Sequence, residues 1–311
     1  MRGRSVLTRR RAIAAAAMAA GLPMRAAATM EPLQLAIGDA RIDVHFGPGE
    51  FDAGRAPLAA WISAAAHAVA VYFGGFPVPL AVIEVRLAEG RAGVFGGVTY
   101  GETPARTKVS LGQHTSTADL ADDWTMTHEL THMSFPSVPE RHHWIEEGIA
   151  TYVEPIARAQ AGTLSVERVW GDMLHDMPKG EPEPGERGLD NTHSWASTYW
   201  GGALFCLMAD VAFRKRTGNR RGLQQALRGI LKAGGNIEVE WPLQRALAAA
   251  DAAAGVPVMA ELYARMGEAP FAPDLAALWR RLGVEKASRG VAFREDAELA
   301  AIRRAITVRQ S

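Results

Sequence analysis

Apolar and polar positions along the chain change their period near Ser116. Before it, residues 33–37 and 41–46 alternate apolar and polar side chains around a Gly-Asp pair, which predicts a β-hairpin. Apolar residues at helical spacing predict a helix over residues 56–73. Further strands are expected, between glycine-containing turns, at residues 80–87, 94–100 and 107–111. This part of the chain therefore predicts a small mixed sheet with a helix.

From about Ser116 the apolar pattern is helical. Ser116 and Asp119 have the spacing of a capping box, which predicts a helix that continues through His132 and ends at the prolines that follow. A second helix is expected over residues 144–161. Prolines and glycines between residues 171 and 190 predict an ordered surface loop or lid. Further helices are expected over residues 197–217, 221–233, 242–254, 258–266, 273–282 and 295–306.

These elements together predict an α+β protein. We expect residues 29–115 to form the sheet part and residues 116–311 to form a mainly helical part that carries the chemistry. The length of 311 residues, 48% of them hydrophobic, is sufficient for a sizeable core in one or two domains.

The N-terminus has the pattern of an export signal. Arginines at positions 9 to 11 precede an apolar, alanine-rich run over residues 12–22, and three alanines at 26 to 28 form a small-residue cleavage site. The arginines resemble a twin-arginine signal, while the general secretory route and a plain basic tail are the alternatives. We expect residues 1–28 to be removed and the mature protein to be periplasmic or secreted.

The charge composition limits the classes of partner that the sequence predicts, and the cysteine content limits the disulfides. The chain has 34 basic and 34 acidic residues, and residues 1–28 contain six arginines and no acid, so 34 − 6 leaves 28 basic residues against 34 acidic ones after cleavage. This mild acidity argues against a nucleic-acid partner. We expect that no later segment is long and apolar enough to cross a membrane, so that no transmembrane anchor is left after the signal is removed. The single cysteine, Cys206, cannot form an internal disulfide.

The segment from His128 to His132 has the spacing of a metal-dependent hydrolase. Residues four apart share a helix face, so both imidazoles can bind one ion. Glu129 would lie beside that ion and hold a water molecule, whose pKa zinc lowers and whose proton Glu129 can accept. A solvated helix with two surface histidines is the alternative. A glutamate on a neighbouring helix would complete three ligands and leave the fourth position open.

The second predicted helix carries a candidate for that glutamate. Residues 144–150, Trp-Ile-Glu-Glu-Gly-Ile-Ala, are similar to the third-ligand helix of the gluzincin zinc peptidases, which reads Trp-Leu-x-Glu-Gly-x-Ala in the aminopeptidase N and glycyl aminopeptidase branches. The resemblance implies a zincin fold, Zn²⁺ as cofactor and Glu147 as third ligand, with Glu146 pointing elsewhere. Metzincins have a glycine and a third histidine where this chain has Phe135 and Val138, so that family is excluded.

A downstream segment strengthens the resemblance. Residues 198–204 resemble the Tyr-x-Lys-Gly-Ala segment of the same branches, with Gly201 in place of the lysine. The resemblance implies that Tyr199 donates a hydrogen bond to the oxyanion of the tetrahedral intermediate. A tyrosine packed at a helix start is the alternative.

The resemblance also implies that substrate lies along an edge strand just before the zinc helix. Gly96 and Gly97 would allow a peptide to approach residues 94–100 closely. Aminopeptidases of these branches carry an acid on this strand that holds the free amine. This strand has none, and Glu102 is off the pattern, so aminopeptidase and endopeptidase activity both stay open.

Several nearby residues are weaker candidates. His193 could donate to the oxyanion or, with Asp190, line the cleft. Thr151 and Glu154 follow Glu147 by one and two helical turns and are candidate partners of the ligand histidines, or simply a helix surface. We interpret His142 and His143 as loop histidines and the tryptophans at 124, 144 and 170 as core residues around the two zinc helices.

The sequence as a whole predicts an exported zinc-dependent metallopeptidase that acts on a peptide or protein. Two alternatives remain: a non-catalytic zinc-containing binding or scaffold protein, and a zinc amidase acting on another amide, such as a cell-wall peptide. Cleavage specificity and oligomeric state are left open by the sequence.

Overall fold

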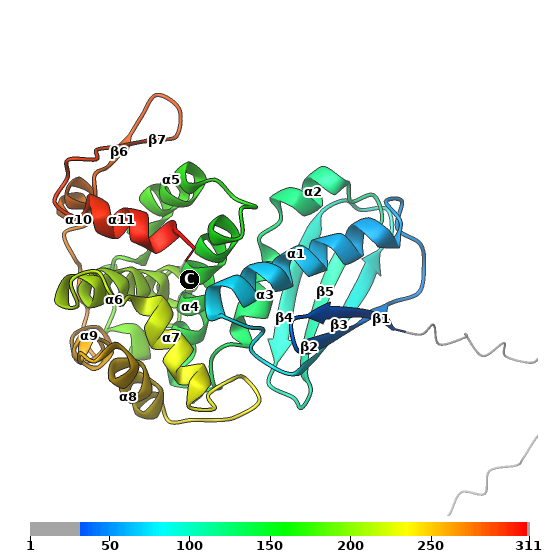
Figure 1. Ribbon diagram of the computed structural model, residues 1–311, viewed down its shortest axis with the longest axis horizontal. Helices are drawn as coiled ribbons and strands as arrows, with labels where there is room; N and C mark the ends of the chain where they lie inside the picture. Colours follow the sequence, from blue (N-terminus) through cyan, green and yellow to red (C-terminus); the bar gives the residue numbers. More distant parts are fainter. Residues whose placement is uncertain (1–31, 310–311) are drawn as a thin grey trace, which may run out of the picture. The chain divides into compact units, whose positions relative to one another are not determined.

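The computed structural model describes residues 32–309, so the expected export signal at residues 1–28 lies outside the described part. Figure 1 shows the main sheet with helix α1 at one side of this part and most of the other helices at the other side. A buried apolar cluster extends from Ile42 in the sheet to Ile306 near the end of the chain. The two parts therefore share one hydrophobic core, and the expected α+β class is confirmed.

Five strands form a mixed sheet. They are β1 (Leu33–Ile37), β2 (Ala40–Phe46), β3 (Leu80–Ala88), β4 (Val94–Tyr100) and β5 (Ala105–Gly112). Their order across the sheet is β1-β2-β3-β5-β4, with β2, β3 and β5 parallel and the two outer strands antiparallel to their neighbours. The predicted hairpin and strands are confirmed, and β4 lies at an edge.

Helix α1 (Arg55–Phe73) packs its apolar side chains into the core, with Leu58, Ile62 and Val69 fully buried. By length and composition it could cross a membrane, since its mean hydropathy is 1.5 over 18 residues, of which 56% are buried here. The expectation that no segment after the signal is long and apolar enough to span was therefore too strict.

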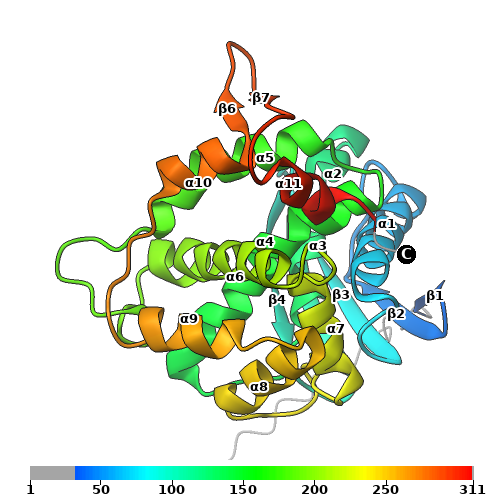
Figure 2. The same ribbon diagram turned by 60° about the vertical axis from the view of Figure 1, so that its left-hand side comes forward.

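Helices make up most of the remaining described chain. They are α2 (Thr117–Asp122), α3 (Thr125–His132), α4 (His143–Gln160), α5 (Val166–Asp176), α6 (Gly202–Arg216), α7 (Leu223–Lys232), α8 (Leu243–Ala254), α9 (Val258–Met266), α10 (Leu275–Leu282) and α11 (Ala300–Thr307). Short 3₁₀ segments are η1 (Glu140–His142), η2 (Met177–Gly180) and η3 (Leu189–Asn191), and η4 (Ala196–Gly201) is π-helical. Figure 2 shows α4 and α6 surrounded by other helices.

The prediction of one helix from Ser116 to His132 was wrong. The capping box at Ser116 is present, but α2 ends at Asp122 and α3 begins at Thr125. The carboxylate of Asp123 accepts hydrogen bonds from the backbone N–H groups of Thr125 and of the next residue, both at 3.1 Å. Asp123 thus caps a new helix, because a short acidic side chain competes with the helical backbone for these donors.

Two segments in the second half also differ from expectation. The predicted loop over residues 171–190 is helical through Asp176 and continues into η2, where Pro178 occupies the first turn and removes no helical hydrogen bond. The predicted final helix begins only at Ala300. Before it lies a hairpin that the sequence pattern did not reveal, because its strands β6 (Val284–Lys286) and β7 (Val291–Phe293) are three residues long.

Helices α4 and α6 touch through their backbones. A Cβ atom on Gly148 would lie 2.2 Å from the carbonyl carbon of Gly202, and one on Gly202 would lie 2.1 Å from the carbonyl oxygen of Trp144. Neither position has room for a side chain. Glycine is therefore required on both helices for this approach, which determines how far apart Glu147 and Tyr199 lie.

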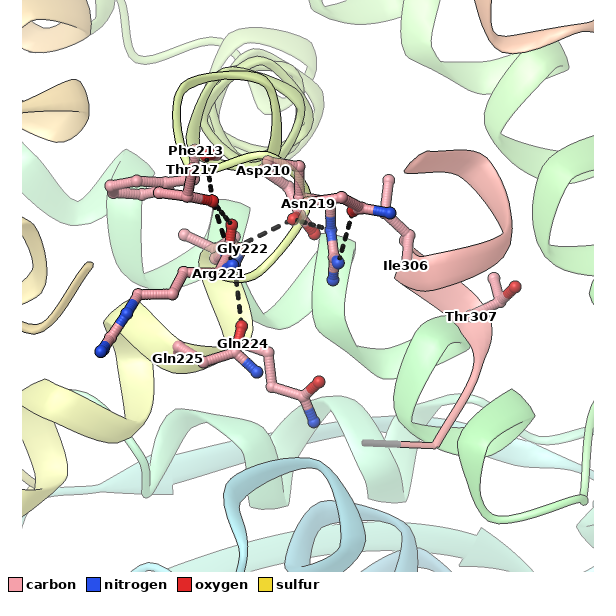
Figure 3. Close-up of polar contacts among 12 residues, drawn as sticks. Asp210, Phe213, Thr217, Asn219, Arg221, Gly222, Gln224, Gln225, Ile306 and Thr307 are labelled. Carbon is pink, nitrogen blue, oxygen red and sulfur yellow. Dashed lines mark hydrogen bonds and ion pairs between the residues drawn. The ribbon is translucent and has the colours of Figure 1, made fainter. Parts of the chain in front are cut away.

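A buried carboxylate ties the far end of α6 to its neighbours. Asp210 accepts hydrogen bonds from Arg214 (2.8 Å), from the backbone N–H of Leu223 (3.1 Å) and from the hydroxyl of Tyr152 (3.1 Å). Figure 3 shows Asp210 beside the turn that joins α6 to α7. Since every charge here is paired, this network holds α4, α6 and α7 together without leaving a buried charge uncompensated.

We predict that Gly148→Ala lowers the free energy of unfolding by about 1–3 kcal/mol, because the added methyl overlaps the backbone of Gly202. Gly171→Ala in α5 is the matched control. Its new methyl would lie 3.8 Å from Val291, so we expect a gain of about 0.5–1 kcal/mol from helix propensity. Urea unfolding followed by circular dichroism measures both, and equal stability of the two variants would contradict the proposed contact.

Candidate metal centre

Helices α3 and α4 bring the three predicted ligands together. His128 Nε2 lies 3.1 Å and His132 Nε2 lies 3.7 Å from Glu147 Oε2. The three ligand atoms lie within 4.8 Å of one another, and within residues 32–309 this is the one such group of three or more potential ligands. Zinc–ligand bonds of about 2.0–2.2 Å fit between donors at this separation. The geometry therefore fits a single metal ion.

The apolar faces of the two helices set this arrangement. Met126 and Leu130 of α3, and Ile145 and Ile149 of α4, are buried almost completely in the core. Because residues three and four apart share a face, burying these side chains turns the two histidines and the glutamate toward the space between the helices.

The protonation states also suit a metal site. Burial, reinforced by the neighbouring His128, lowers the pKa of His132 to about 3, so His132 is neutral near pH 7 and keeps a free lone pair. Burial alone would raise the pKa of Glu147, but hydrogen bonds from His128 and His143 hold it well below its usual range. A neutral imidazole at His132 and an ionised carboxylate at Glu147 are the forms that bind a metal.

His143 has a role that the sequence did not indicate. It is the first residue of α4 rather than a loop residue, and its Nε2 lies 3.2 Å from Glu147 Oε1. Its Nδ1 lies 2.8 Å from Glu146. Contacts with these two carboxylates, Glu146 first, raise the pKa of His143 to about 10, so this cationic contact is present at neutral pH and is lost as the pH rises through that value. His143 therefore holds Glu147 Oε1 in place. Glu146 contacts His143 and is not part of the ligand cluster, as the resemblance implied.

Glu129 lies next to the cluster and against strand β4. Its Oε2 accepts a hydrogen bond of 2.8 Å from Thr99, and burial raises its pKa. A Cβ atom on Gly97 would lie 2.4 Å from Glu129 Cγ, whereas one on Gly96 would meet nothing within 4 Å. Gly97 therefore makes room for Glu129. Contact of either glycine with a substrate remains a prediction.

Tyr199 lies beside the cluster on η4. Its ring stacks on His128, with centroids 6.0 Å apart, and on the exposed ring of Trp195, with centroids 5.7 Å apart. Burial and then the negative charge of Glu147 raise the pKa of Tyr199 to about 12. The phenol therefore keeps its proton at physiological pH and can donate a hydrogen bond.

A cavity of about 310 Å³ lies directly beside His128 and Tyr199. Thr151 and Glu154 both line it, and Glu154 is paired with Arg158 at 2.9 Å, although burial raises its pKa to about 7. Neither residue forms a hydrogen bond with a ligand histidine among the described side chains, so their role as partners stays a prediction. The remaining lining residues are Asp122, Trp124, Pro155, Leu164, Arg168, Asp172, Asp176, Trp195 and Trp200.

The prediction that Trp124 lies in the core was wrong, because 53% of its surface is exposed. Its ring packs edge-on against His128, with centroids 5.3 Å apart. Trp124 lies in the break between α2 and α3, and it lines the cavity that His128 and Tyr199 also line. Trp144 and Trp170 are buried, as predicted.

Within residues 32–309, the weaker candidates His193 and Asp190 do not belong to the cluster of potential ligands. His193 is exposed, and in the described part of the chain it makes no hydrogen bond with them. Asp190 is buried and accepts hydrogen bonds from Trp144 (2.8 Å) and Tyr263 (2.6 Å), while His142 Nδ1 lies 2.7 Å away. Asp190 and His142 therefore fasten η3 to α4 and α9.

The fold of this chain is also found in other proteins of known structure. No protein-family model and no curated protein matches the sequence. Solved structures do match. An aminopeptidase N family protein from Idiomarina loihiensis has a TM-score of 0.60 at 12% identity, over 81% of this chain and 49% of that one.

The M1 zinc metallopeptidase from Deinococcus radiodurans has a TM-score of 0.51 at 16% identity, over 78% of this chain and 52% of that one. A mutant of that peptidase bound to a Tyr-Ser-Ala substrate has the same TM-score and identity, over 78% and 53%. The chain thus shares the fold of these proteins and spans about half the length of each.

We predict that the purified protein binds one divalent metal ion per chain and that His132→Ala abolishes stoichiometric binding by removing one of three ligands. His175→Ala is the matched control, because His175 is exposed and lies 2.6 Å from Asp176, away from the cluster. Elemental analysis by mass spectrometry after dialysis measures the metal. Equal metal content in both variants would rule out the cluster as the binding site.

Proposed function

We propose that this protein is an exported zinc-dependent metallopeptidase that hydrolyses peptide bonds. The observation that supports this most directly is the convergence of Glu129 and Tyr199 on the cluster of His128, His132 and Glu147. Two imidazoles and one carboxylate are a ligand set of catalytic zinc sites that keep a fourth position open. When bound, the ion would polarise the scissile carbonyl and lower the pKa of the attacking water.

The residues of the chain have complementary parts in this proposal. Glu129 accepts the proton of the attacking water and later delivers it to the leaving amine, and its raised pKa favours holding that proton during the exchange. Tyr199 stays protonated and donates a hydrogen bond to the developing oxyanion. The cavity beside His128 offers space for a substrate side chain.

Whether the enzyme requires a free N-terminal amine on its substrate is a separate question. Strand β4 carries no acidic residue, and Glu102 just after it is bonded to Arg106 at 2.9 Å. We propose that recognition does not depend on a free amine at β4. Short peptides, such as the tripeptide bound by the Deinococcus radiodurans mutant, are suitable first substrates, each tested with a free and with an acetylated N-terminus.

We predict that Glu129→Gln lowers kcat by a factor of about 10²–10⁴, since the amide cannot accept the proton of the attacking water. The variant should keep its metal, because Glu129 is not one of the three ligands. Cleavage is followed by mass spectrometry of the peptide products. If Glu129→Gln still cleaves at the wild-type rate, the proposed mechanism is wrong.

A second variant separates the oxyanion donor from the base. Tyr199→Phe removes only the phenolic hydroxyl, and we predict a loss of about 10²–10³ in kcat with little change in KM. Tyr72→Phe is the matched control, because Tyr72 is buried in α1 and its hydroxyl has no hydrogen-bond partner among the described residues. Steady-state kinetics on one peptide compare the two. Equal kcat in both variants would leave Tyr199 as a packing residue.

The same measurements decide between the alternatives. Retained metal with no hydrolysis of any peptide supports a zinc-containing binding or scaffold protein, and cleavage confined to cell-wall fragments supports an amidase. Export is proposed from the pattern of residues 1–28, and sequencing of the mature N-terminus would test it.

A further inference from the structure

We propose that Thr99 on β4 is a positioning residue for Glu129, acting together with Thr107 on β5. Two hydroxyl groups in series would hold the carboxylate in the orientation that hydrolysis needs. This inference rests on the proposed function, because it concerns how the proposed base is oriented. It assigns to the edge strand a task other than contact with substrate.

The contacts of Thr99 determine the direction of the hydrogen bonds. Its Oγ1 lies 2.8 Å from Glu129 Oε2, 3.0 Å from the backbone oxygen of Glu129 and 2.9 Å from Thr107 Oγ1. An ionised carboxylate only accepts, so Thr99 must donate its single hydrogen to Glu129. Its oxygen is then left to accept from Thr107, which is fully buried. Hydrogen bonds in such a series strengthen one another, and those to a charged acceptor are the stronger kind.

The register of the sheet places both hydroxyl groups. Thr99 is paired directly with Thr107 across β4 and β5, so their side chains lie on the same face of the sheet. Alternation along a strand puts Gly97 on that face as well. The absent side chain at Gly97 leaves the space that Glu129 fills, since a Cβ there would lie 2.4 Å from Cγ and 2.9 Å from Oε1. Glu129 is therefore confined by Gly97 and held by Thr99.

The consequence for catalysis follows from the two carboxylate oxygens. Thr99 engages Oε2, and among the described side chains Oε1 has no hydrogen-bond donor. Oε1 is thus the oxygen available to accept a proton from water. Without Thr99, the carboxylate can rotate about its last side-chain bond, and a displacement of about 1 Å in a catalytic group can reduce the rate by about 10²-fold.

The experiment compares Thr99→Val, which keeps the shape and removes the hydroxyl, with Thr99→Ser, which keeps the hydroxyl. We expect Thr99→Val to lower kcat about 10-fold to 100-fold with KM within about 3-fold of wild type, and Thr99→Ser to restore most of kcat. Thr217→Val is the matched control. It removes a buried hydroxyl that donates to Phe213 at 2.8 Å, in the turn after α6 shown in Figure 3, so it should affect stability and not kcat.

Crystal structures of wild type and Thr99→Val provide a readout independent of turnover. We expect one orientation of the Glu129 carboxylate in wild type and a displaced or divided one in Thr99→Val. If wild type cleaves no peptide, the proposed function fails and the crystal structures still decide whether Thr99 orients Glu129. Unchanged kcat in Thr99→Val, an unchanged carboxylate, or a Thr99→Ser variant as slow as Thr99→Val would each overturn the inference.

Discussion

Two carboxylates, Glu129 and Glu147, are buried beside the same pair of imidazoles, and the surrounding structure makes this tolerable. Like charges at short range oppose ionisation, and burial opposes it further. Glu147 is compensated by contacts with His128, His132 and the cationic His143. Glu129 is stabilised by Thr99. A divalent cation would add the largest compensation, which is a physical reason for this donor set to hold one.

The parts of the site that are local in sequence could be predicted, and those that depend on packing could not. The spacing of His128 and His132 places both side chains on one face of a helix. Glu147 could be identified from its place before Gly148, a position where only glycine fits against α6. His143 and Thr99 gave no such signal. Each acts through a partner on another element, so no spacing along the chain marks it.

The break between α2 and α3 also depends on a contact with another element. The sequence pattern predicts that Asp123 lies within a helix, but its carboxylate caps the start of α3. The same carboxylate accepts a hydrogen bond of 3.1 Å from Trp61 of α1. The fold is shared with an aminopeptidase N family protein and an M1 zinc metallopeptidase of known structure at only 12% and 16% identity. At that distance it is the path of the backbone that is common to these chains, and function has to be argued from the site.

The π-helical segment η4 makes the orientation of Tyr199 depend on the number of residues in this segment as well as on their identity. A π-helical turn contains about one residue more than an α-helical turn, and such turns arise when a single residue is added to an α-helix. Each residue of an α-helix advances the chain by about 100°, so removing a residue between Tyr199 and the start of α6 at Gly202 would rotate Tyr199 relative to α6. In evolutionary terms, a single-codon insertion or deletion can therefore create or abolish the stacking of Tyr199 on His128.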